Sequence, residues 1–81
     1  MHYQGTMIIA QCRMARAALR WSLDDLATES GVGRRTIAKF EAGGSVVPET
    51  LDRLAAAFIG AGVAFIDEGG RVGVSVRRVD A

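Results

Sequence analysis

The stretch WSLDDLATESGVGRRTIAKFEAG, residues 21–43, constrains the fold of this chain more than any other. Ser22 can accept a hydrogen bond from a free backbone N–H group and Asp25 follows three residues later, so together they predict a helix start. Gly31 supplies the backbone freedom that ends such a helix. Gly33 is the expected cap of a second helix, which the final glycine of the stretch stops. The stretch therefore predicts two short helices joined by a tight turn.

The second helix of this pair has an apolar face and a cationic start. Ile37 and Phe40 share one face, while Arg34, Arg35 and Lys39 project elsewhere. Two short helices with a glycine in the turn, the second one cationic at its start, are the sequence form of a helix-turn-helix. DNA is therefore the first partner to consider.

Residues 26–43 resemble the Xre-like family, the phage repressor and Cro type of bacterial regulator. The match is carried by two runs, Leu26-Ala27-x-x-x-Gly31-Val32 and Arg34-Arg35-Thr36-Ile37-x-Lys39-Phe40-Glu41-x-Gly43. It extends from the first helix of the chain to Gly62. The resemblance implies a DNA-binding regulator that acts as a homodimer on a palindromic operator, most often as a repressor.

The segments outside this stretch predict two more helices. Thr6 can cap a helix over 7–20, and Pro48 suits the first position of a helix over 48–60. Apolar residues recur along the first of these at helical spacing. The expected inner stripe is Ile8, Cys12, Ala15 and Leu19, widened by Met14 and Ala18.

The tail of the chain changes to a period of two. Residues 63–66 are short and apolar, residues 67–70 are a turn signal, and Val72, Val74 and Val76 alternate with other residues. The expected fold class is mostly α: a four-helix repressor-like helix-turn-helix domain with a C-terminal β-hairpin. Residues 1–62 form the DNA-binding domain, with the helix-turn-helix at 22–43, and residues 63–81 add the hairpin and tail to the same compact unit.

A lone two-stranded hairpin is marginal in water, so this one must pack on the helices or pair with another copy. The valine face of Val72, Val74 and Val76 and the unpaired strand edge suit a homodimer interface. The alternative is that the hairpin packs on its own helices and the dimer forms elsewhere.

Arginine and lysine neutralise phosphates and read guanine O6 and N7 in the major groove. We expect Arg35 and Lys39 to read bases, and Arg34 to read a base or a phosphate. Thr36 can contact a phosphate or a thymine methyl group, and Arg13 a phosphate. The candidate DNA-binding set is Arg34, Arg35, Thr36, Lys39, Gly33 and Arg13.

The resemblance also implies a structural ion pair and a second candidate function. In the family a basic residue at the position of Arg16 pairs with an acid that corresponds to Glu41. Three positions depart from the family pattern, because Leu23, Gly33 and Ala42 stand where polar side chains are usual. These departures, with an exposed Leu23 and the valine-rich hairpin, favour the alternative of a protein-interaction module, such as an antitoxin or antiactivator, with weak or no DNA binding.

Composition excludes several other classes. The net charge is only +1, so any nucleic-acid footprint must come from local clustering. Cys12 is the only cysteine and is expected to be a small buried hydrophobe, and His2 stands alone. The chain has no nucleophile with a base, no phosphate loop and no metal-spaced cluster, so we expect no enzyme, cofactor or metal. No apolar run is long enough for a membrane span and no signal peptide is visible, which predicts a cytoplasmic protein.

Overall fold

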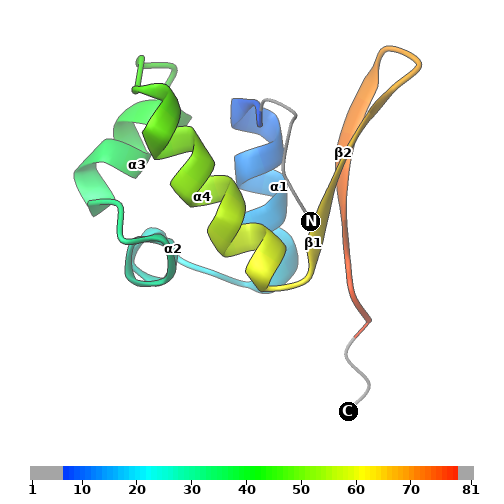
Figure 1. Ribbon diagram of the computed structural model, residues 1–81, viewed down its shortest axis with the longest axis horizontal. Coiled ribbons are helices and arrows are strands. Elements are labelled where there is room, and N and C mark those ends of the chain that lie inside the picture. Colours follow the sequence, from blue (N-terminus) through cyan, green and yellow to red (C-terminus); the bar gives the residue numbers. More distant parts are fainter. Residues whose placement is uncertain (1–6, 79–81) are drawn as a thin grey trace.

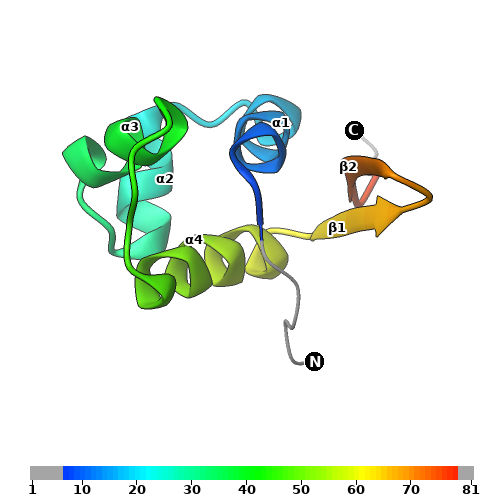
Figure 2. The same ribbon diagram turned by 90° about the horizontal axis from the view of Figure 1, so that it is seen from above.

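The computed structural model describes residues 7–78 of the chain. In this part the chain forms four helices followed by a two-stranded antiparallel hairpin (Figure 1). The elements follow in the order α1 (Ile9–Leu19), α2 (Leu23–Ser30), α3 (Arg34–Glu41), α4 (Pro48–Gly60), β1 (Val63–Glu68) and β2 (Arg71–Val76). The predicted mostly helical fold with a C-terminal hairpin is confirmed. Figures 1 and 2 place α3 and the hairpin on opposite sides of the molecule, with α1 and α4 between them.

The start and end of α2 follow from the residues that predict them. The Asp25 backbone N–H donates to Ser22 Oγ at 3.0 Å, and the Ser22 backbone N–H donates to Asp25 Oδ2 at 2.8 Å. Each side chain therefore satisfies a backbone donor that the helix leaves free. Gly31 ends the helix in the left-handed region, with φ 74°. Ser30 adds a contact that sequence reasoning missed, since its hydroxyl donates to Leu26 O at 2.7 Å and accepts from the Val32 N–H at 3.1 Å.

The first helix differs from the expectation at its N-terminal end. It begins at Ile9 rather than at residue 7, because Ile8 has an extended backbone and its N–H is capped by Gln11 Oε1 at 3.1 Å. The predicted cap, Thr6, lies outside the described residues. Met7 enters the core in place of the exposed Ile8.

The inner stripe of α1 is also narrower than predicted. Cys12 and Ala15 are buried and Leu19 packs against the core, as expected. Met14 and Ala18 are exposed. Ala18 lines a groove between the C-terminal ends of α1 and α4 and the end of β2, outside the core. Gln11 is also buried, which the apolar pattern does not predict. A buried amide needs polar partners, and these cannot be identified from the pattern of α1 alone.

The core lies between the four helices and the base of the hairpin. Each of the four helices and β1 contributes at least one buried side chain to this core. Strand β2 contributes Val74, which is partly buried and packs against it. Aromatic rings continue this core toward the hairpin: Trp21 stacks on Phe58 with centroids 5.8 Å apart, and Phe58 meets Phe65 edge-on at 6.2 Å. The buried apolar residues that form this core cluster are Met7, Cys12, Ala15, Leu26, Val32, Ile37, Phe40, Leu54, Phe58 and Val63.

The hairpin packs on its own helices. Its turn uses Gly69 and Gly70, both at positive φ (61° and 74°), which is the pattern of a two-residue type I′ turn. Gln11 Nε2 donates to the carbonyl oxygens of Ile66 and Gly73, at 3.0 and 3.1 Å, and so ties both strands to α1. The valine face expected on β2 is therefore divided, because Val74 packs against the core while its neighbours at 72 and 76 remain 38% and 39% exposed.

Candidate nucleic-acid interface

Helix α3 presents a cationic face to solvent. Ile37 and Phe40 are buried against the rest of the domain. Arg34, Arg35 and Lys39 are exposed. Because the apolar side of α3 is fixed in the core, the three cations lie together on the outer side of the helix-turn-helix. This is the surface that the sequence assigns to DNA.

Asp24 lies beside the first of these cations. Arg34 Nε lies 2.9 Å from Asp24 Oδ1, and the two side chains keep 61% and 77% of their exposure. The pair connects the first turn of α2 to the first turn of α3. As an acid in the first turn of α2, Asp24 suits the positive end of that helix, and the sequence offers no spacing signal for a contact across the turn.

The segment after α3 shapes the position of Lys39. Gly44 donates its N–H to Lys39 O at 2.8 Å, and a Cβ on Gly44 would lie 2.6 Å from Lys39 Cγ. Gly44 is therefore required for the stem of Lys39 to lie where it does. Lys39 and Thr36 form one wall of a shallow groove of about 540 Å³, and residues 45–48 form the other.

The C-terminal end of α3 is fastened to α1 by a two-point ion pair. Arg16 Nε donates to Glu41 Oε2 at 2.8 Å and Arg16 Nη2 donates to Glu41 Oε1 at 2.7 Å. Arg16 Nη1 donates further to Trp21 O at 3.1 Å. The side chains are 22% and 8% exposed, so the pair is largely removed from water.

Cys12 is the third member of this cluster. Its thiol donates to Glu41 Oε2 at 3.3 Å. Burial, followed by the hydrogen bond and charge of Glu41, raises the pKa of the Cys12 thiol to about 12. Burial alone would raise the pKa of Glu41, but the hydrogen bonds from Arg16 and Cys12 outweigh it and hold that pKa below its ordinary value. The hydrogen bond to Glu41 raises the pKa of Arg16. The cluster is therefore a charged pair with a protonated thiol beside it at neutral pH.

The remaining candidates occupy different parts of this surface. Gly33 is the N-cap of α3, without a side-chain hydrogen bond. Arg13 is exposed on α1, near enough to Glu41 for its charge to lower the pKa of that carboxyl group. Leu23, expected to be exposed, is instead half-buried and packs against the core, because the first turn of α2 directs it inward.

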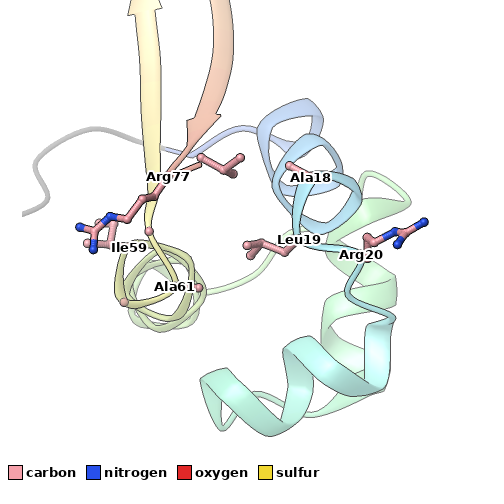
Figure 3. Close-up of a pocket in the computed structure, with 9 residues that line it drawn as sticks. Ala18, Leu19, Arg20, Ile59, Ala61 and Arg77 are labelled. Carbon is pink, nitrogen blue, oxygen red and sulfur yellow. The ribbon is translucent and has the colours of Figure 1, made fainter. Parts of the chain in front are cut away.

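A second groove lies on the hairpin side of the molecule. It has a volume of about 340 Å³ and is lined by the C-terminal ends of α1 and α4 and by the end of β2. Figure 3 shows Leu19 directed into it, whereas the guanidinium groups of Arg20 and Arg77 point away. This groove is separate from the cationic face of α3.

Residues 7–78 lack two other kinds of site. No group of three or more His, Cys, Asp or Glu side chains there could hold a metal ion. No helix in the same residues is long and apolar enough to cross a membrane.

Comparison with known families agrees with this geometry. A family model described as helix-turn-helix matches residues 13–59, which is more than half of the chain. The chain belongs to the Xre/Cro-type helix-turn-helix family. No curated protein matches the chain significantly.

Membership in the Xre/Cro-type family settles the general class of function. It is a family of DNA-binding domains rather than of enzymes, and it implies DNA as a partner in transcription regulation. The matched residues contain all of α2 and α3 and most of α1 and α4. The hairpin lies beyond them, so its role has to be argued from its own residues.

Proposed function

We propose that this protein is a sequence-specific transcription regulator that inserts α3 in the major groove of an operator. The observation that carries the proposal is the exposed row of Arg34, Arg35 and Lys39 on a helix whose other face is buried. A helix of this kind fits the major groove, where arginine pairs with guanine O6 and N7. Arg35 and Lys39 read bases, and Arg34 reads a base or a phosphate.

Other groups set the position of the protein on the duplex. Thr36 borders the groove between α3 and residues 45–48, where it can meet a phosphate or a thymine methyl group. Arg13 is exposed on α1 and supplies a charge for a phosphate. The cap at Gly33 carries no side chain that would hold the backbone of α3 away from DNA. Phosphate contacts of this kind position the protein without selecting a sequence.

A palindromic operator requires two copies with recognition helices about 34 Å apart. The hairpin supports a homodimer through the outer edge of β2. The Arg77 N–H donates to Gly62 O, so in the alternating ladder the N–H and C=O groups of Val72, Val74 and Val76 point away from β1. A second β2 strand, antiparallel and centred on Val74, would pair with these groups. The exposed side chains of Val72 and Val76 would then meet across the two-fold axis.

Selection of bound duplexes from a random pool tests the DNA proposal. A consensus site should emerge, and Arg35→Ala should weaken binding to it by about 1–3 kcal/mol and relax one base position. Arg13→Ala is the control, because a lost phosphate contact lowers affinity for all sequences alike. Equal loss on specific and random DNA for Arg35→Ala would refute the base-reading role.

Light scattering over a range of concentrations tests the dimer. Replacing Val72 and Val76 together by Lys should give a folded monomer, because like charges would face each other across the axis. Its melting temperature should no longer depend on protein concentration, since that dependence comes from association. Ile66→Lys is the control, since Ile66 is 40% exposed on the opposite face of the hairpin. A wild-type monomer at high concentration, or a dimer that survives both lysines, contradicts the β2 edge.

A protein-interaction module, such as an antitoxin or antiactivator, is the second candidate. The exposed Val47 beside the groove next to Lys39 favours it, because an apolar side chain there suits a protein better than a phosphate. The burial of Leu23 weighs against it. Binding to DNA that falls steeply with salt and depends on Arg35 would support the regulator, and its absence would support the module.

A further inference from the structure

The ion pair of Asp24 and Arg34 joins the first turns of the two helices of the helix-turn-helix. Arg34 Nε lies 2.9 Å from Asp24 Oδ1. Both side chains are mostly exposed, at 61% and 77%, and exposed pairs contribute little to folding stability. Among residues 7–78 no other acid lies within ion-pair distance of Arg34. The pair therefore has little structural consequence, but it lies on the surface proposed to face DNA.

The side of the guanidinium that Asp24 occupies is informative. Arginine carries its N–H donors in a fixed planar fork. The closest contact of the carboxylate is an ion-pair contact at Nε, and within residues 7–78 Nη1 and Nη2 make no hydrogen bond, so the terminal edge is open to another partner. Guanine offers O6 and N7 as two neighbouring acceptors in the major groove, and such a two-donor edge can contact both.

We propose that Asp24 is a positioning residue for base recognition, which holds Arg34 with its terminal edge directed at a guanine. The inference rests on the proposed function and deepens it. Arginine loses much side-chain freedom when it is ordered, so an arginine already held by a carboxylate loses less on binding. DNA also displaces water from around the pair, and the attraction between Asp24 and Arg34 then becomes stronger than in the free protein.

The same carboxylate has the opposite effect on binding to random DNA. Its negative charge repels phosphates, so its removal raises affinity for any sequence. Asp24→Asn should therefore raise affinity for random duplexes and lower the preference for the correct base pair. A residue that acts only through its charge would change both affinities by the same factor.

The experiment uses the full chain with three duplexes: the selected site, the site with one base pair substituted, and a random sequence. Arg34→Ala identifies the base pair that Arg34 reads. Asp24→Asn should reduce the preference for that pair about fivefold to tenfold, a part of the discrimination that one bidentate contact provides. Asp25→Asn is the matched control, because it removes the same charge one residue further on and should keep the preference. Melting curves establish that each variant is folded.

The double variant completes the test. In an Arg34→Ala background, Asp24→Asn should cause no further loss of preference at that base pair, because the residue it positions is gone. The inference is overturned if Asp24→Asn keeps the preference that Arg34→Ala abolishes, or if it lowers the preference equally in both backgrounds. A folded wild-type chain without preference for any duplex overturns the proposed function itself, which is a separate result.

Discussion

Two ion pairs hold the two ends of α3, and they differ in nearly every physical respect. At the C-terminal end, Arg16 and Glu41 meet at two points with side chains 22% and 8% exposed. At the N-terminal end, Arg34 Nε lies 2.9 Å from Asp24 Oδ1, and the two side chains are 61% and 77% exposed. A charge left alone in the first place is costly, whereas water compensates a charge left alone in the second. We therefore expect the C-terminal (inner) end of α3 to contribute to stability and the N-terminal (outer) end to contribute to recognition.

The strongest test breaks the inner pair. Arg16→Met should lower the free energy of unfolding by about 3 kcal/mol, because Glu41 then stays buried without a counter-charge. The lower part of the usual range applies because Arg16 retains some contact with water. Urea denaturation measures the change, with Arg13→Met as a control that removes an exposed arginine of the same helix. An unchanged midpoint for Arg16→Met would make the inner pair a surface contact.

The pH dependence of stability provides a second test of the Arg16–Glu41 pair. The pKa of Glu41 is lowered in the folded state, so its contribution to stability is present above the ordinary value of 4.5 and is lost as the pH falls through the folded value. In Arg16→Met, protonation of Glu41 removes the unpaired buried charge and with it the loss of stability that this charge causes. Burial raises the pKa of the unpaired Glu41 in Arg16→Met, so the difference in stability between the wild type and Arg16→Met should begin to narrow above pH 4.5 and continue to narrow below it. A constant difference from neutral to acid pH would exclude Glu41 as its source.

Leu23, which precedes Asp24 in the first turn of α2, tests whether every residue near the N-terminal end of α3 contributes little to stability. Leu23→Gln should lower the free energy of unfolding by about 1 kcal/mol, because a half-buried leucine loses apolar contact with the core. Thermal melting of Leu23→Gln beside Asp24→Asn compares neighbouring positions on one turn. If both variants melt with the wild type, the inward packing of Leu23 carries no stability.

The smallest effect is expected for the outer pair. Arg34→Ala should change the free energy of unfolding by less than about 0.5 kcal/mol, since exposed pairs gain little in water. The measurement is the same urea titration used for Arg16→Met. If Arg34→Ala lowered the free energy of unfolding as much as Arg16→Met does, the two ends of α3 would not differ in their contribution to stability.

Sequence patterns predicted most helix starts and ends correctly, because these are set by residues close by in the chain. The reciprocal cap at Ser22, the left-handed Gly31 and the proline that opens α4 each act on their own turn of chain. The start of α1 was misjudged because its N-cap, Ile8, has no side-chain oxygen that would mark the start of a helix in the sequence.

The candidate site was predicted only in part. The cationic residues of α3 could be named from the period of the helix and from the family resemblance. Asp24 could not, because its contact with Arg34 depends on how two helices approach across a turn. The burial of Gln11 depends on a hairpin more than 50 residues away in the sequence, with separations of 55 and 62 residues to its two acceptors.

The rate at which the buried Cys12 thiol is alkylated can report how often this fold opens. Alkylating reagents attack the thiolate, and a pKa of about 12 leaves almost none of it at neutral pH while the fold is closed. Labelling must wait until α1 separates from the end of α3 and exposes the sulfur. The chain has one cysteine, so the labelling rate at excess reagent would report the frequency of that single opening event. Followed with and without operator DNA, the same rate would show how far binding at one face slows motion in the interior.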